Sequence, residues 1–169
     1  MKTVKTAAAA LAAIILSFLI CSCAGKGGEA RKCTVSITCE TILDNMDKLS
    51  DEKKELVPED GVILAETEAV FYEGESVFDL LLRVCKEKNI HMEFENTPVY
   101  NSAYIEGINN LYEFDCGSLS GWMYSVNGDF PNYGCSNYSL KEGDAVKWVY
   151  TCDLGADVGA GMSEQGRDK

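Results

Sequence analysis

Histidine is nearly absent from this sequence, and its cysteines lack the spacing of a metal site. The 169 residues include one histidine, His91, and no Cys-x-x-Cys pair. Structural zinc sites use cysteine and histidine ligands at short spacings, so we expect no metal centre. Thiol–disulfide catalysis is disfavoured too, because it uses the same missing motif. His91 alternates outward on a short predicted strand over residues 90–94, which indicates a surface residue rather than a catalyst.

Motifs that position a catalytic nucleophile or a phosphate group are missing as well. The sequence contains neither a Gly-x-Ser-x-Gly nucleophile elbow nor a Gly-rich phosphate loop. Its carboxylates are numerous, but no pair occupies an apolar setting of the kind that separates a catalytic acid from a base. We therefore expect a protein that is not an enzyme and that requires no cofactor.

Positive charge is scarce. The sequence has 15 Lys and Arg residues against 27 Asp and Glu, a formal net charge of −12. Nucleic-acid binding depends on Lys and Arg side chains that neutralise phosphates, so we expect no nucleic-acid partner. The excess of carboxylates mainly favours solubility and leaves the nature of a small ligand open.

The N-terminus has the pattern of a bacterial lipoprotein signal. Residues 7–20 are apolar apart from one serine and follow Lys2 and Lys5. This run is shorter than the roughly 20 residues that span a bilayer, and it fits the core of a signal peptide. Ser22 then provides the small residue before Cys23, so we expect cleavage after residue 22 and acylation of Cys23. The alternative is an ordinary secretory signal with incidental cysteines.

This signal predicts a protein of the bacterial cell envelope, extracytoplasmic and anchored to the membrane through acylated Cys23. The loss of Lys2 and Lys5 on cleavage would change the net charge from −12 to −14. The expected division is a signal peptide over residues 1–22, a flexible glycine-rich tether over 23–32, one domain over 33–158 and a disordered tail over 159–169.

Six cysteines remain in the exported domain, an even number that is typical of a disulfide framework. They are Cys33, Cys39, Cys85, Cys116, Cys135 and Cys152. The sequence alone does not choose among the pairings that six cysteines allow. Our assignment is Cys39–Cys85, Cys116–Cys135 and Cys33–Cys152, and the last bridge would join the first strand to the last.

Hydrophobic periodicity predicts strands and one well-defined helix. Alternation places strands over residues 33–39, 61–72, 90–94, 121–126 and 145–152. The helix begins after Ser76, a capping residue, and ends at Asn89. Its apolar stripe predicts that it covers one face of the sheet. Asn109-Asn110 has the composition of a hairpin turn.

The aromatic stretch over residues 121–129 is expected in the middle of the sheet. Asn127-Gly128 supplies the two residues that accept a positive φ at a tight hairpin turn. The strand projects a turn-rich loop over residues 130–138. Aromatic rings and amides in this region are candidates for ligand binding. These candidates are Trp122, Tyr124, Asn127, Asn132, Tyr133 and Tyr138. A role in the core is the alternative for Trp122 and Tyr124.

Four motifs together resemble a known family. They are residues 72–81 (YEGESVFDLL), 121–128 (GWMYSVNG), 140–148 (LKEGDAVKW) and 150–155 (YTCDLG). In this order they resemble the transcobalamin-like C-terminal domain, known in bacteria as domain of unknown function 4430, over about Cys33 to Gly159. The resemblance implies an α+β fold with a small mixed β-sheet and one main packed helix, β-grasp-like and here expected to be disulfide-stapled.

The same resemblance suggests what the domain binds. In animal transcobalamins and intrinsic factor, the similar domain closes over cobalamin beside a helical domain, which has no counterpart in this sequence. We expect a cell-surface binding module that captures a small ligand, with cobalamin or another corrinoid as the candidate and an uptake transporter as the partner. The alternative is an envelope adhesion or protein-interaction module without a small-molecule ligand.

Overall fold

The computed structural model describes residues 28–99 and 101–160. The predicted signal peptide, the predicted acylation site Cys23 and residues 161–169 lie outside the described residues. Within the described ranges, no helix is both long enough and apolar enough to cross a membrane.

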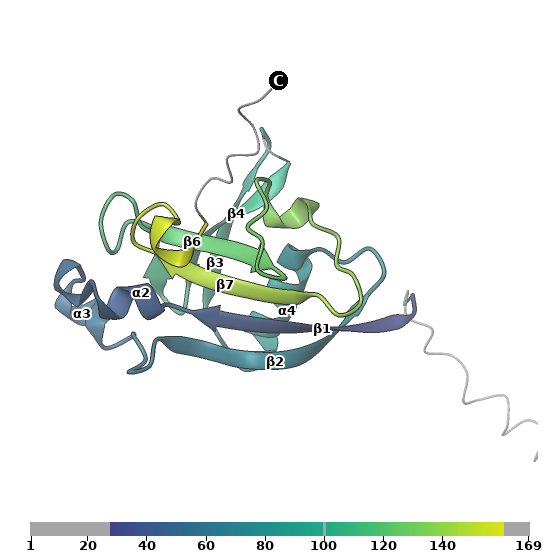
Figure 1. Ribbon diagram of the computed structural model, residues 1–169, viewed down its shortest axis with the longest axis horizontal. Helices are drawn as coiled ribbons and strands as arrows, with labels where there is room; N and C mark the ends of the chain where they lie inside the picture. Colours follow the sequence, from purple (N-terminus) through teal and green to yellow (C-terminus); the bar gives the residue numbers. More distant parts are fainter. Residues whose placement is uncertain (1–27, 100, 161–169) are drawn as a thin grey trace, which may run out of the picture.

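Four strands form the main sheet, which is mixed. They are β1 (Ala30–Thr38), β2 (Val62–Tyr72), β6 (Gly121–Val126) and β7 (Ala145–Thr151), in the order β2-β1-β7-β6. β1 pairs with β2 antiparallel and with β7 parallel, and β6 pairs with β7 antiparallel. The first and last strands of the domain therefore lie side by side in the centre of the sheet (Figure 1).

Three further strands form a separate antiparallel sheet. They are β3 (Met92–Thr97), β4 (Ser102–Ile108) and β5 (Leu111–Tyr112), in the order β3-β4-β5. Asn109 and Asn110 turn the β4–β5 hairpin with φ angles of 54° and 59°, as their composition predicted. The α+β class is confirmed, but the single β-grasp-like sheet that we expected is wrong. The described strands divide between two sheets because β3–β5 pair only with one another.

The predicted main helix is α4 (Val77–Lys88), and both of its ends follow from the sequence. The Ser76 hydroxyl accepts from the Asp79 backbone N–H at 3.2 Å, and the Asp79 carboxylate accepts from the Ser76 N–H at 2.8 Å. This reciprocal capping box satisfies two donors that the helix leaves unpaired. Asn89 ends the helix with a left-handed φ of 55°.

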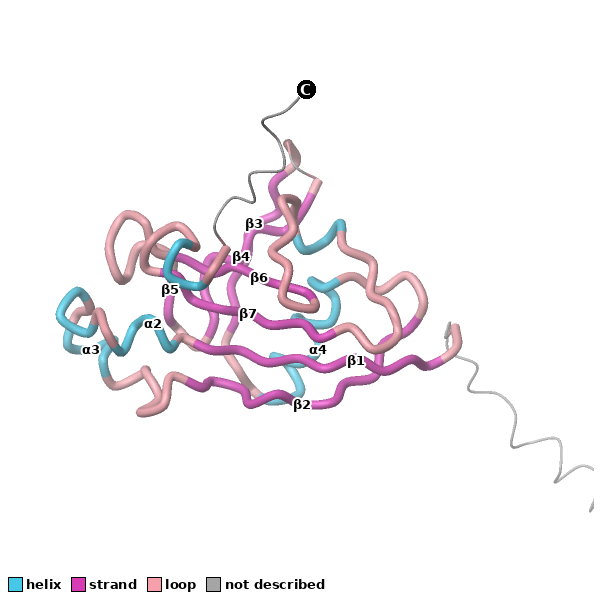
Figure 2. The backbone as a smooth tube through the Cα atoms, in the orientation of Figure 1, coloured by secondary structure: helices cyan, strands magenta, loops and turns pink. Residues whose placement is uncertain are grey.

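The remaining helices are single turns. Residues between β1 and β2 form α2 (Glu40–Leu43), the 3-10 turn η1 (Met46–Lys48) and α3 (Asp51–Lys54). Two further 3-10 turns, η2 (Cys135–Asn137) and η3 (Ala156–Val158), lie on either side of β7 in the sequence. Figure 2 shows α2 and α3 together at one end of the main sheet.

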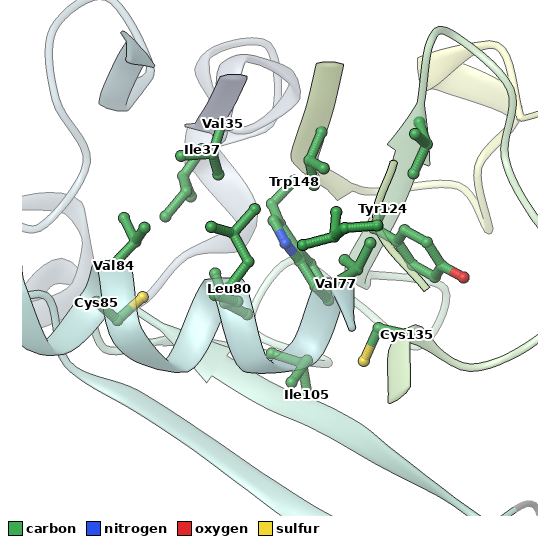
Figure 3. Close-up of a cluster of buried hydrophobic side chains, with 14 of the residues drawn as sticks. Val35, Ile37, Val77, Leu80, Val84, Cys85, Ile105, Tyr124, Cys135 and Trp148 are labelled. Carbon is green, nitrogen blue, oxygen red and sulfur yellow. The ribbon is translucent and has the colours of Figure 1, made fainter. Parts of the chain in front are cut away.

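The main core, which we call the helix core, lies between α4 and the two sheets. Alternate residues of the main sheet point to one face, because the side chains of a strand alternate. Val35, Ile37 and Trp148 thereby meet Leu80 and Val84 of the helix. Figure 3 shows α4 between these sheet residues and Ile105 of β4. The prediction that the helix covers one face of the sheet is confirmed.

A smaller apolar cluster, which we call the end cluster, closes the end of the sheet near α2. Trp122 bridges the two clusters, since its ring packs against both. Its ring meets that of Tyr150 edge-on at 5.3 Å between centroids. The buried members of the end cluster are Cys39, Ile42, Leu49, Leu111, Cys116, Tyr150 and Cys152.

We expected the aromatic strand β6 in the middle of the sheet. It lies instead at the edge of the main sheet. β6 pairs only with β7 among the described strands, and β2 forms the opposite edge. The alternation and the turn of β6 were nevertheless predicted correctly. Asn127 and Gly128 have φ angles of 56° and 88°. An aromatic-rich strand can lie at an edge here because Tyr124 and Trp122 pack inward onto Trp148 and Tyr150.

The expected disulfide staple is not present among the described residues. The cysteines from Cys33 to Cys152 are all free thiols, and all six are buried. Their sulfurs make the weak hydrogen bonds that thiols form. The Cys33 thiol donates to the Ala69 carbonyl at 3.7 Å and the Cys135 thiol to the Ala103 carbonyl at 3.5 Å.

The fold also separates the members of each pair that we had assigned. Cys33, Cys85 and Cys135 belong to the helix core, whereas Cys39, Cys116 and Cys152 belong to the end cluster. For Cys33 and Cys152 the reason is strand direction. β1 and β7 are parallel, with Thr34 opposite Ala145. The two cysteines therefore lie at opposite ends of this strand pair, about 26 Å apart at roughly 3.3 Å per residue.

Burial holds these thiols in the protonated form. It raises the pKa of Cys33 and Cys135 to about 11. It raises the pKa of Cys39, Cys85 and Cys116 to about 12. The thiolate is the reactive form of cysteine, so these side chains act as small apolar core residues.

Stability should therefore fall with alkaline pH. A thiol in the unfolded chain ionises near pH 8.5, whereas the folded protein keeps Cys33 and Cys135 protonated to about pH 11. Above about pH 8.5 the unfolded state binds fewer protons, so the free energy of unfolding decreases as pH rises. Urea denaturation in reductant between about pH 8 and pH 10 should show this decrease. Cys85→Ala should reduce the slope, and a pH-independent stability would contradict the thiol assignment.

Candidate functional site: an aromatic hollow beside β4

The loop that follows β6, residues 130–138, is anchored at the start of α4. We call it the aromatic loop. The Val77 backbone N–H donates to the Tyr138 carbonyl at 3.1 Å, and the Leu140 N–H donates to the Glu75 carbonyl at 3.0 Å. A single β-bridge also joins Ser76 to Ser139. The same residue that caps the helix thus helps to fix the end of the loop.

The middle of the loop is anchored on β4. The Ala103 N–H donates to the Ser136 hydroxyl at 3.0 Å, and the Ser136 N–H donates to the Ser102 hydroxyl at 3.3 Å. Gly134 makes this close approach feasible, because a Cβ at this position would lie 2.0 Å from the Ser102 Oγ. The glycine is therefore required by space rather than by a positive φ, since its φ is −66°.

Tyr124 supports the loop from the core. Its ring packs on Trp148 with 5.5 Å between centroids. Its hydroxyl points out of the core in Figure 3 and donates to the Tyr133 carbonyl at 2.9 Å. Burial raises the pKa of this phenol, so it remains a hydrogen-bond donor at any physiological pH. A core side chain thereby fixes the backbone that carries the exposed Tyr133.

These anchors leave a hollow between the loop and β4. We call it the aromatic hollow, and its volume is about 320 Å³. Tyr104 and Tyr133 are each 48% exposed, so both rings offer a free surface beside it. The rings of Tyr133 and Tyr138 stack with 6.3 Å between centroids and 16° between planes. The lining residues are Ser102, Ala103, Tyr104, Pro131, Asn132, Tyr133 and Gly134.

A second depression adjoins the aromatic hollow and shares Ser102 and Ala103 with it. Its volume is about 300 Å³, and Asn96, Asn101 and Ser136 contribute polar atoms to its lining. Tyr104 hydrogen-bonds to the Glu113 carboxylate. Its pKa is raised to about 12, first by burial and then by this carboxylate. The surface on both sides of Ser102 therefore combines aromatic faces with neutral amides and hydroxyls.

The structure brings three of the six predicted ligand residues together. Asn132 and Tyr133 line the aromatic hollow, and Tyr138 stacks behind Tyr133. Tyr124 lies beneath the loop as its support. Tyr104 was missed by the sequence analysis, which had no signal to connect a residue of β4 with a loop about 30 positions later.

Trp122 and Asn127 lie elsewhere and make internal hydrogen bonds. The Trp122 indole N–H donates to the Leu111 carbonyl at 2.8 Å. The Asn127 amide donates to the Asp144 carboxylate at 2.9 Å, and its side-chain oxygen accepts from the Ala145 N–H at 2.9 Å. These contacts fix the β6–β7 hairpin.

The described residues contain no group of three or more His, Cys, Asp and Glu side chains placed to hold a metal ion. His91 is exposed, and its Nε2 lies 3.3 Å from the Glu93 carboxylate. The aromatic hollow itself contains no carboxylate or basic side chain. Its chemistry is therefore that of stacking and neutral hydrogen bonding.

Comparison with known proteins bears out the family resemblance. Residues 74–152 match the family described as Domain of unknown function (DUF4430). The crystal structure of haptocorrin in complex with Cbi has a similar fold, with a TM-score of 0.54 and 12% sequence identity. The match covers 75% of this chain and 26% of that chain, so this chain spans about a quarter of haptocorrin. At this identity the likeness concerns the fold.

A second solved structure comes from Ruminococcus gnavus ATCC 29149 and is provisionally described as a metal binding protein. It matches with 15% identity and a TM-score of 0.42, covering 72% of this chain and 96% of that chain. No curated protein matches the sequence. The chain thus resembles the transcobalamin-like C-terminal domain in motifs and in fold.

Substitution of Gly134 by alanine should displace the loop from β4. The added Cβ overlaps the Ser102 side chain, and such overpacking costs about 1–3 kcal/mol. The urea midpoint should fall accordingly. Gly121→Ala is the matched control, because its Cβ would meet only Glu113 at an ordinary 3.6 Å. Equal stabilities for the two variants would show that the close contact at Ser102 is not needed.

Proposed function

We propose that this chain is a lipid-anchored binding module of the bacterial cell envelope that captures a small ligand, with a corrinoid as the candidate. The observation that supports this most directly is the aromatic hollow, in which two half-exposed tyrosines and Asn132 face one cavity. The fold adds to this support, because a similar fold forms part of haptocorrin, which is described in complex with Cbi.

The chemistry of the hollow suits such a ligand. A corrinoid is a large macrocycle with apolar faces and a rim of amide side chains. The rings of Tyr104 and Tyr133 provide apolar faces, while Asn132 and Ser102 provide neutral donors and acceptors. The lining of the hollow has no charged side chain, so a ligand that covers it does not remove an ionised group of the protein from water.

The size of the hollow defines how much of the ligand it can hold. With about 320 Å³, and about 300 Å³ in the adjoining depression, the surface accommodates one edge of a macrocycle rather than the whole. Binding of an edge leaves most of the ligand accessible, which suits a module that passes its ligand to an uptake transporter. The proposal involves no catalytic step.

Binding should be measured with the mature chain and cobinamide or cobalamin by calorimetry. Each ring that contacts the ligand should contribute more than about 1 kcal/mol, as anchoring aromatics do. Tyr133→Ala and Tyr104→Ala should therefore weaken binding roughly tenfold each. The matched control is Tyr72→Ala, because Tyr72 is 42% exposed but lies on β2, away from the hollow.

Two outcomes would overturn this proposal. One is the absence of heat with any corrinoid at micromolar protein. The other is binding that Tyr72→Ala weakens as much as Tyr133→Ala does. Capture of envelope proteins that depends on Tyr133, without corrinoid binding, would favour the interaction-module alternative.

The anchor can be tested separately in a bacterial host. The mature protein should carry an acyl modification that Cys23→Ala abolishes, because Cys23 follows the small residue Ser22. Mass spectrometry of the membrane fraction measures this directly. Cys21→Ala is the matched control and should leave acylation intact. An unmodified protein released after cleavage would instead identify an ordinary secretory signal.

A further inference from the structure

A further cavity in the described part of the chain lies away from the aromatic hollow. Its volume is about 490 Å³, and it shares no lining residue with the hollow. We call it the open-face cavity. Its floor includes Thr38, Ser125, Lys147 and Val149, which alternate along their strands with the residues of the helix core. It therefore lies on the face of the main sheet opposite α4, the face turned toward the viewer in Figure 1.

Short elements form the sides of the cavity. The turn α2 provides one wall, the β6–β7 hairpin with Phe130 another, and η3 a third. The carboxylate of Asp157 in η3 already has hydrogen-bond partners within the protein, because it accepts from the Thr151 hydroxyl and from the Cys152 N–H. This carboxylate holds its wall in place rather than facing a ligand.

Two hydroxyl groups in the floor lack a partner. Thr38 is 8% exposed and Ser125 is 4% exposed. Both line the cavity, yet neither hydroxyl has a hydrogen-bond partner within residues 28–99 and 101–160. Thr41 differs, since its hydroxyl donates to the Tyr150 carbonyl at 2.6 Å. Among the described residues the buried side-chain atoms without a partner are Arg83 Nε and Trp148 Nε1, so these two hydroxyls reach the open cavity, where they can bond to a polar ligand.

Opposite charges mark the two ends of the cavity. Lys147 lies opposite Ser125 in β6 and Ser36 in β1. Glu40 and Asp44 lie on α2, just beyond the end of β1. None of these three charged groups forms an ion pair with another described residue. Glu40 follows Ser36, the β1 neighbour of Lys147, by four positions, so the Cα atoms of Ser36 and Glu40 are at most about 13 Å apart, and Lys147 lies one strand, about 5 Å, to the side.

We propose that the open-face cavity binds a short zwitterionic peptide of about three residues. Its ammonium group lies at Glu40 and Asp44, its carboxylate lies at Lys147, and its amides bond to Thr38 and Ser125. Three extended residues span about 10 Å, which fits the separation of the charges. This function goes beyond the proposed corrinoid binding and uses none of its residues.

The charges decide between this ligand and an anionic one. The cavity is lined by three carboxylates, those of Glu40, Asp44 and Asp157, against one ammonium group, and the chain carries a net charge of −12. A ligand with only negative charge would be repelled. A free-ended peptide instead presents one opposite charge to each end of the cavity.

Calorimetry of the mature chain with tri-alanine and with N-acetyl-tri-alanine amide tests the proposal. Tri-alanine should bind, and the capped peptide should bind at least about tenfold more weakly, because both charge-assisted contacts are lost. Lys147→Met should weaken tri-alanine binding by a similar factor. Lys141→Met is the matched control, since Lys141 is exposed and lies outside the cavity.

Equal binding of the free and capped peptides would overturn the proposal. So would the absence of tri-alanine binding, whether or not a neutral sugar such as maltotriose binds. Thr38→Val keeps the shape of the floor and should weaken binding of both peptides. Tyr133→Ala should leave peptide binding unchanged, and Lys147→Met should leave corrinoid binding unchanged. The failure of one site is therefore distinguishable from the failure of the other.

Discussion

The parallel pairing of β1 with β7 is the constraint on which the rest of the domain depends. It joins residues about 110 positions apart, with Thr34 opposite Ala145 and Thr38 opposite Val149. The contact continues before the start of β7, where the Gly143 N–H donates to the carbonyl of Lys32 in β1 at 2.8 Å. Until this pair forms, β2 and β6 have no common sheet to join. α4 then has no complete apolar face to cover.

This central pair also fixes what each face of the sheet can do. Val35, Ile37 and Trp148 point toward α4 and are removed from water. The residues between them point the other way, and none of the described helices longer than one turn covers that face. A ligand site on this face therefore follows from the topology, since the short elements α2 and η3 enclose it only in part. The aromatic hollow has a different origin, because it forms where a loop crosses from the main sheet to β4.

Local features of this fold were predictable from the sequence, and non-local ones were not. The Ser76 cap of α4 and the turns at Asn109-Asn110 and Asn127-Gly128 depend on residues close in the chain, and all three were predicted correctly. The edge position of β6 and the second sheet depend on which strands pair, which alternation alone does not encode.

The cysteines illustrate the same limit in chemical terms. Their even number predicted disulfides, yet each lies in an apolar cluster that buries its thiol. Their spacing in the sequence carries no information on whether two strands run parallel. That direction is what places Cys33 and Cys152 at opposite ends of the β1–β7 pair.

For the candidate sites too, the sequence indicated only residues that lie close together in the chain. Asn132 and Tyr133 were found because they lie on one aromatic loop of the sequence. Tyr104 was missed because it reaches the hollow from another sheet. The open-face cavity was missed altogether, since its floor alternates residue by residue with the core and its charges come from α2 and β7.

Strand β6 connects the two sites through its alternation. Tyr124 points to the helix core and holds the aromatic loop, whereas its neighbour Ser125 points to the open-face cavity. A slip of one residue in the pairing with β7 would exchange these two side chains. Asn127 prevents such a slip, because its side chain binds both Asp144 and Ala145 at the start of β7. The residue that we had considered a ligand contact thus sets the register on which both sites depend.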